Sequence, residues 1–142
     1  MRFWDTSAVV PLLLTESATR PARELLNSDP SVVVWWTTRT ECISALTRQT
    51  REGNLTPVEE SHARRILAAL ASQWSEVAAS ERVRQRAERI LGLHSLRAAD
   101  AFQLAAALVW SKADPSEHAL VSFDERLRDA AAREGFDVLP AG

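Results

Sequence analysis

Apolar and polar positions follow two recurring patterns along this chain. Short apolar runs rich in β-branched or aromatic residues are typical of buried strands. Between them lie longer segments whose apolar residues recur every three or four positions, as in amphipathic helices. Strands are expected at residues 1–5, 31–36, 75–79, 119–123 and 136–139. Helices are expected at residues 8–14, 19–26, 38–52, 56–74, 80–91, 95–111 and 124–134.

The alternation of strands and helices predicts an α/β fold. Strands separated by helices form a parallel sheet, and the helices then cover both of its faces. We therefore expect a three-layer α/β/α sandwich. The 142 residues contain no internal repeat, linker or low-complexity segment, and this length suits one domain. The prediction is a single domain spanning residues 1–142.

The composition of the chain limits the functional classes to which the protein can belong. A net charge of −2 gives no global basic field to attract nucleic acid. All basic residues except Lys112 are arginines, the better phosphate ligands, although Arg- and Ala-rich sequences more often reflect GC-rich coding.

The lone Cys42 excludes an intramolecular disulfide and a multi-cysteine zinc site, which fits a reducing compartment. Without an apolar run of membrane-spanning length or a convincing signal peptide, we expect a cytoplasmic protein with no membrane contact.

One carboxylate needs an explanation. Asp100 lies in a predicted helix, residues 95–111, that is apolar on almost every side. An unpaired carboxylate in such surroundings costs several kcal/mol. A cationic side chain, a wet cleft or a metal ion must therefore face Asp100. Gln103 shares its helical face, so we expect this polar pair to face something wet or charged.

Three other acids fall where a parallel sheet gathers side chains. Asp5 ends the first strand, Asp124 directly follows the fourth, and Glu41 lies in the first turn after the second. In an open parallel sheet, ligands bind outside the carboxyl ends of the strands. We therefore expect Asp5, Glu41 and Asp124 to meet Asp100 at one edge of the sheet.

Each acid also has an ordinary structural interpretation. Asp5 and Asp124 are good helix N-cap residues. Glu41 fits the last position of a helix capping box, and Asp100 has Arg97 one turn earlier as an ion-pair partner. These four interpretations are independent of one another, whereas a single crevice accounts for all four acids.

Converging carboxylates repel one another unless a cation compensates them. Oxygen ligands suit Mg²⁺ or Mn²⁺, while the three scattered histidines argue against zinc. Such a cation is typical of phosphate chemistry, because it activates water and neutralises phosphoryl oxygens. The chain has no nucleophile elbow, P-loop or dinucleotide fingerprint. A receiver-like phospho-acceptor needs paired acids at the first strand end and a lysine near the last strand. This chain has a single acid, Asp5, at the first strand end, and its only lysine is Lys112.

Several motifs recur in one known family. They are, in chain order, Asp5-Thr6-Ser7-Ala8, Glu41, Leu96-Arg97-Ala98-Ala99-Asp100-Ala101 and Val121-Ser122-Phe123-Asp124. In these contexts the whole chain resembles the PIN domain, specifically the small ribonuclease toxins of the VapC type. Ser122 departs from the family, which often has Thr there, but keeps the hydroxyl.

The resemblance implies a Mg²⁺- or Mn²⁺-dependent endoribonuclease with Asp5, Glu41, Asp100 and Asp124 in its acidic pocket. It gives Asp5 and Asp100 the most direct contact with the metal. Glu41 would support the site or activate water, and Asp124 would complete it. Ser7 would hydrogen-bond an acid or a metal-bound water. The supporting residues are Thr6, Ser7, Gln103 and Arg97.

The resemblance also implies partners: an RNA substrate, a small antitoxin protein and a second copy in a homodimer. Substrate RNA would need a local basic patch, for which the candidates are Arg39, Arg48, Arg51 and Arg97. Two alternatives stay open. One is a PIN module that binds metal and RNA without turnover, and the other is a housekeeping RNA-processing nuclease.

Overall fold

The computed structural model describes residues 1–142. The strands are β1 (Arg2–Trp4), β2 (Val32–Trp35), β3 (Ser75–Val77), β4 (Ala119–Val121) and β5 (Asp137–Leu139). The α-helices are α1 (Thr6–Leu13), α2 (Thr19–Ser28), α3 (Thr38–Arg51), α4 (Pro57–Ala71), α5 (Glu81–Leu93), α6 (Ala98–Trp110) and α7 (Glu125–Glu134). A short 3-10 helix, Pro115–Glu117, precedes β4. No helix is long and apolar enough to cross a membrane.

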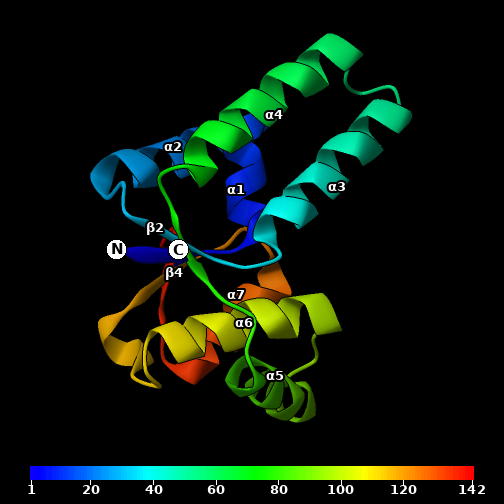
Figure 1. Cartoon of the computed structure of the whole chain (residues 1–142). Coiled ribbons are helices and arrows are strands. Elements are labelled where there is room, and N and C mark those ends of the chain that lie inside the picture. The colour runs from blue at the N-terminus through cyan, green and yellow to red at the C-terminus, as the bar shows by residue number, and fades with distance from the viewer.

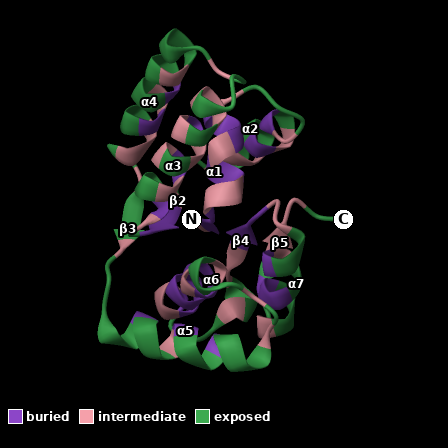
Figure 2. Ribbon diagram, turned by 90° about the vertical axis from the view of Figure 1, so that its right-hand side faces the viewer, coloured by how far each residue is buried: buried purple, intermediate pink, exposed green.

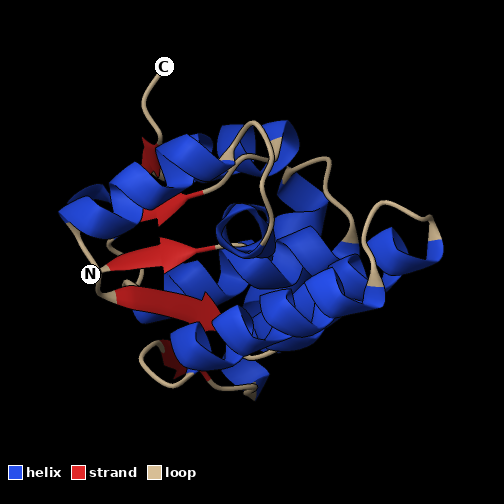
Figure 3. Cartoon of the chain, turned by 90° about the horizontal axis from the view of Figure 1, so that it is seen from above, coloured by secondary structure: helices blue, strands red, loops and turns tan.

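The five strands form one parallel sheet in the order β3-β2-β1-β4-β5. Figure 3 shows the strand arrows pointing the same way. The chain moves outward from β1 to β3 and then returns to place β4 on the other side of β1. Strand order therefore reverses between β1 and β4, and a ligand crevice is expected outside their carboxyl ends.

Helices cover both faces of the sheet, as predicted. Helices α1 to α4 lie on one face and α5 to α7 on the other (Figure 1). Successive residues of a strand point to opposite faces. Phe3 and Val33 accordingly belong to the apolar core beneath α5 to α7, while Trp4 and Val34 belong to the core beneath α1 to α4. The three-layer α/β/α sandwich is thus confirmed.

Helix α6 is the most buried helix of its layer, and Figure 2 shows buried residues along much of it. Residues 103–108 are all buried, whereas Ala98 and Ala99 at its first turn are exposed. The helix therefore packs its body against the sheet and opens its first turn, which carries Asp100, to the carboxyl edge.

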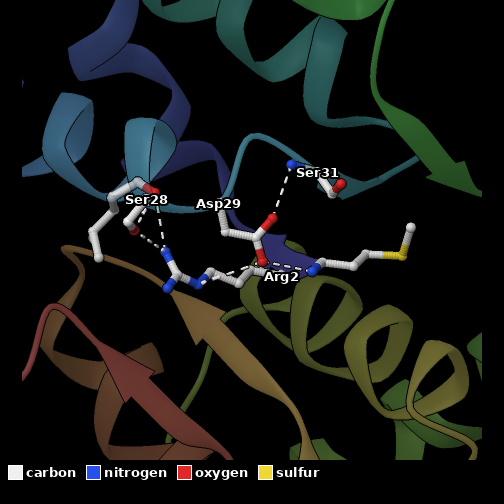
Figure 4. Close-up of polar contacts among 6 residues, drawn as sticks. Arg2, Ser28, Asp29 and Ser31 are labelled. Carbon is white, nitrogen blue, oxygen red and sulfur yellow. Dashed lines mark hydrogen bonds and ion pairs between the residues drawn. The ribbon is translucent and has the colours of Figure 1, made fainter.

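The start of β1 is fixed by a set of polar contacts with the end of α2 and the loop that follows it (Figure 4). Arg2 Nη1 donates to the carbonyl oxygen of Leu25 at 3.0 Å and to Ser28 Oγ at 2.9 Å. Asp29 Oδ1 accepts from the backbone nitrogen of Ser31 at 3.0 Å. These contacts hold β1 in register with β2, so the position of Asp5 beyond β1 follows from the sheet.

Five predicted helix boundaries were wrong by two or three residues. Helices α2 and α5 each end two residues beyond the expected positions 26 and 91. Helix α1 begins at Thr6 rather than residue 8, which puts Asp5 at the cap position. Helix α6 begins at Ala98 rather than residue 95, because Arg97 has an extended backbone that cannot continue a helix. Helix α4 ends at Ala71 rather than residue 74, since the chain must turn before β3 starts at Ser75.

The packing of α6 predicts the effect of a core truncation. Leu104→Ala should lower the free energy of unfolding by about 2–5 kcal/mol, because Leu104 is fully buried and its loss leaves a cavity. Leu93→Ala, at an exposed leucine, should cost less than about 0.5 kcal/mol. Urea denaturation measures both values. Equal losses for the two variants would show that α6 does not occupy this core.

Candidate active site

Asp5 lies at the junction of β1 and α1 and is 3% exposed. Its backbone nitrogen donates to the carbonyl oxygen of Val121 at 3.1 Å, so the ends of β1 and β4 are joined there. Although Asp5 occupies the N-cap position of α1, its side chain makes no capping hydrogen bond. The carboxylate instead accepts from Ser7 Oγ at 2.8 Å. The capping interpretation of Asp5 is therefore wrong.

Two serine hydroxyls connect Asp5 to the strand end that carries Asp124. Ser7 Oγ lies 3.3 Å from Ser122 Oγ and accepts from the backbone nitrogen of Phe123 at 2.9 Å. Ser122 Oγ accepts from the backbone nitrogen of Asp124 at 3.1 Å. The Asp-Thr-Ser motif after β1 and the segment after β4 thus form one hydrogen-bonded unit.

Burial raises the pKa of Asp5 to about 7. Hydrogen bonds from Ser7 and Ser122 oppose this shift, and the negative charge of Asp124 adds to it. A carboxyl group that is buried beside another acid, with no cationic side chain bonded to it, holds its proton up to neutral pH. A cation at this position would favour the ionised form.

Asp124 caps helix α7, and this structural interpretation is correct. Its Oδ1 atom accepts from the backbone nitrogen of Leu127 at 3.0 Å. Its Oδ2 atom makes no hydrogen bond. The cap therefore fixes the carboxylate while leaving one oxygen available for another ligand.

Asp100 lies in the first turn of α6 and is half-buried. Its pKa is raised by burial first, and then by the negative charges of Asp124 and Glu41, while Arg97 and Arg126 lower it. No nitrogen of Arg97 lies within ion-pair distance of its carboxylate, so the predicted structural alternative of an ion pair is wrong. Asp100 instead shares the electrostatic field of two other acids.

Glu41 is held by a side chain from the residue before α3 and by one from α6, and not by a capping box. Its Oε2 atom accepts from Thr37 Oγ1 at 2.6 Å and from Gln103 Nε2 at 3.1 Å. No side chain caps the start of α3. The Oε1 atom of Glu41 makes no hydrogen bond.

Gln103 connects three helices. Its Nε2 atom lies 3.0 Å from Thr6 Oγ1 and 3.1 Å from Thr38 Oγ1, besides its contact with Glu41. The residue is 1% exposed, so of the two expected surroundings it meets the charged one, the Glu41 carboxylate, together with the hydroxyls of Thr6 and Thr38, and not water. Its Oε1 atom is buried without a hydrogen-bond partner.

The structure brings most of the predicted residues to the carboxyl edge of the sheet. Electrostatic effects on pKa link the acids in pairs: Asp5 with Asp124, Asp124 with Asp100, and Asp100 with Glu41. The supporting residues Thr6, Ser7 and Gln103 are bonded within this set, whereas Arg97 makes no ion pair. Thr37 and Thr38 were not predicted, although two hydroxyls directly after a strand that ends near an acid are a usable sequence signal.

The residues at this edge fit a hard divalent cation. The atoms that these four acids could offer to a metal are all oxygens, two of the carboxyl groups have raised pKa values, and a buried amide oxygen lacks a partner. No three His, Cys, Asp or Glu side chains are gathered closely enough to hold a metal ion by themselves. Mg²⁺ and Mn²⁺ keep several waters when bound, so some of the acids would act through water.

Cys42, beside Glu41 on α3, is not a competing nucleophile. Burial, together with the negative charges of Glu41 and Asp5, raises the pKa of its thiol to about 12. The thiolate is the reactive form of cysteine. Cys42 is therefore a core residue.

Comparisons with known proteins agree on one fold. The family model named PIN domain matches residues 2–133. No curated protein sequence matches the chain. A chain of a toxin-antitoxin complex from Klebsiella pneumoniae has a TM-score of 0.64 at 16% identity, with 87% of each chain covered.

Two other solved structures are similar over nearly their full length. VapC20 from Mycobacterium tuberculosis, a sarcin-ricin loop cleaving toxin, has a TM-score of 0.63 at 19% identity, with 92% of this chain and 95% of that chain covered. FitAcB from Neisseria gonorrhoeae has a TM-score of 0.66 at 19% identity, with 97% and 96% covered. At such low identities the likeness shows a shared fold.

The raised pKa of Asp5 predicts that replacing this residue with one that cannot ionise increases the stability of the folded protein, by an amount that depends on pH. Between about pH 4 and 7 the unfolded chain loses this proton while the folded protein keeps it, so the free energy of unfolding falls as pH rises. Asp5→Asn cannot ionise and should be more stable than wild type at pH 8, by an amount on the order of a few kcal/mol. The difference should vanish near pH 4.

Urea denaturation of metal-free protein across this pH range measures the effect. Asp129→Asn, at an exposed acid of α7, is the control and should follow wild type at every pH. Parallel pH profiles for wild type and Asp5→Asn would contradict the burial of an ionisable group at this position.

Proposed function

The chain belongs to the PIN-domain family, and we propose that it is a metal-dependent endoribonuclease that hydrolyses phosphodiester bonds of RNA. The supporting observation is the grouping of Asp5, Glu41, Asp100 and Asp124 at the carboxyl edge of the sheet, where the negative charges of neighbouring acids help to raise the pKa values of Asp5 and Asp100. Such a set is unfavourable for stability alone, and a divalent cation with a phosphate group would compensate it.

Asp5 and Asp100 are the proposed direct ligands of Mg²⁺ or Mn²⁺. When bound, such an ion lowers the pKa of water and neutralises charge on phosphoryl oxygens. Ser7 and Ser122 orient Asp5, and the capping contact of Asp124 fixes that carboxylate at the edge of the site. Glu41 is held through Oε2 by Thr37 and Gln103, which leaves Oε1 free to accept a proton from an attacking water.

Exposed arginines support a negatively charged substrate. Arg39, Arg48, Arg51 and Arg97 are all exposed or partly exposed, and none takes part in an ion pair. Three of them lie on α3, the helix that carries Glu41. Arg39 in the first turn of α3 and Arg97 directly before α6 flank the helix starts that carry Glu41 and Asp100, and their guanidinium groups would offset the repulsion of an RNA backbone by the acids.

We further propose that the protein is the toxin of a toxin-antitoxin pair and works as a homodimer in the cytoplasm. Its fold is shared with a chain of the Klebsiella complex, whose name describes a toxin bound to its antitoxin. A small antitoxin protein is the partner that this likeness supports. A housekeeping RNA-processing nuclease would have the same site without such a partner.

The proposed activity predicts the loss of RNA cleavage in two variants. Asp5→Asn and Asp100→Asn each remove a charge from the metal site, so cleavage by partner-free protein should fall on the order of 100-fold or more. Excess EDTA should abolish it and added Mg²⁺ or Mn²⁺ should restore it. Asp129→Asn should cleave as wild type does. Gel analysis of labelled RNA gives the rates.

Three outcomes separate the competing functions. Equal cleavage in EDTA, or full activity of both site variants, would contradict the metal mechanism. RNA binding without cleavage of any tested RNA would identify a binding module. A stable acyl phosphate on Asp5 or Asp124 after incubation with a phosphodonor would indicate a phospho-acceptor.

A further inference from the structure

A second feature of the carboxyl edge is an aromatic cleft of about 660 Å³ beside Glu41. It lies between the end of β2, the segment before α5 and the first turns of α6. Its volume falls in the range of small-molecule binding sites. The lining residues are Trp35, Trp36, Thr37, Glu41, Ala79, Ser80, Glu81, Arg84, Ala98, Ala99 and Phe102.

The floor of this cleft is a preformed aromatic stack. The rings of Trp35 and Phe102 lie nearly parallel, with an interplanar angle of 4° and centroids 5.7 Å apart. Trp35 is buried, and Phe102 comes from the helix that carries Asp100. The stack is therefore rigid and is tied to the acidic site through α6.

Trp36 is the unusual residue of the cleft. Its side chain is 58% exposed, although an indole ring favours burial. Its backbone nitrogen donates to the carbonyl oxygen of Val77 at 3.1 Å, which extends the pairing of β2 with β3. The exposed ring thus projects from a fixed backbone next to Glu41. An exposed aromatic side chain on a rigid support beside an active site is suited to stacking with a flat ligand.

The rim of the cleft distinguishes among ligands. It carries two carboxylates, Glu41 and Glu81, and one guanidinium, Arg84, which already donates to Glu81 Oε2 at 2.9 Å. This charge disfavours a phosphate group. Carboxylate and hydroxyl oxygens can accept from the amino and imino groups of a nucleobase, whose faces meanwhile stack on aromatic rings. A purely apolar side chain would leave these polar groups without partners.

We propose that this cleft binds an unpaired nucleobase of the RNA substrate, stacked against Trp36, next to the phosphate that the acidic site cleaves. The inference rests on the proposed function, because the acids define where the phosphate lies. It makes Trp36 a substrate-binding residue and single-stranded RNA the preferred form of substrate, since a paired base cannot enter the cleft.

The test measures binding separately from cleavage. Fluorescence anisotropy would report the affinity of Asp100→Asn protein for labelled 2′-O-methyl homopolymers of ten nucleotides and for a fully abasic decamer. Adding Trp36→Leu, which keeps an apolar side chain but removes the aromatic face, should weaken binding of at least one homopolymer by about 5- to 100-fold. Binding of the abasic decamer should not change. Trp36→Phe should restore part of the loss, and Val58→Ala, at another exposed apolar residue, should have no effect.

The proposal would be overturned if Trp36→Leu and its parent bound the homopolymers with equal affinity. It would also be overturned if Trp36→Leu lost as much affinity for the abasic decamer as for the homopolymers, or if the parent bound no homopolymer. Unchanged RNA binding with a loss of self-association in sedimentation would assign Trp36 to a protein interface instead. If binding depends on Trp36 but wild type cleaves no RNA, the nuclease proposal fails and the base site stands. If wild type cleaves RNA and Trp36→Leu binds RNA as its parent does, the nuclease proposal stands and the base site fails.

Discussion

The burial of a carboxyl group between the ends of β1 and β4 is the constraint on which the rest of the site depends. The strand order of the sheet reverses between β1 and β4, and a crevice forms outside the carboxyl ends of the two strands there. Asp5 fills it with an acid that water barely reaches. Two serines satisfy its oxygens in part, but no basic side chain neutralises its charge. The fold thus holds an electrostatic cost that a bound cation would relieve.

The surrounding contacts keep this unfavourable arrangement in place. Gln103 joins α1, α3 and α6 through a single amide, which fixes Glu41 and the first turn of α6 relative to Asp5. The cap of α7 fixes Asp124, and the seryl hydroxyls join the two strand ends. The acids belong to four separate segments. Hydrogen bonds hold the carboxylates of Asp5, Glu41 and Asp124, and one oxygen of Glu41 and one of Asp124 are left without a bond. Such preorganisation is what a metal site requires, because carboxylates free to move apart would lower their repulsion without a cation.

Much of this arrangement could be predicted from the sequence. Apolar runs and helical periodicity located every strand and α-helix, although not the 3-10 helix Pro115–Glu117, and the rule for parallel sheets placed Asp5, Glu41 and Asp124 at one edge. The partners of these acids could not be predicted in the same way. Gln103 shares a helical face with Asp100 in sequence, yet it turns to hydroxyls of α1 and α3, and that depends on how three helices pack. Asp124 caps α7 and also raises the pKa values of Asp5 and Asp100, although from the sequence the cap and the grouping with other acids are alternatives.

The central claim is that the four acids form one site for a divalent cation. Titration of Mn²⁺ into partner-free protein, with free Mn²⁺ followed by electron paramagnetic resonance, tests it directly at pH 8. Asp5→Asn and Asp100→Asn should each weaken binding by about 10-fold or more, in keeping with the loss of a carboxylate ligand. Glu41→Gln and Asp124→Asn should weaken it less, and Asp129→Asn should not change it. Wild-type affinity in both Asp5→Asn and Asp100→Asn would contradict a shared metal site.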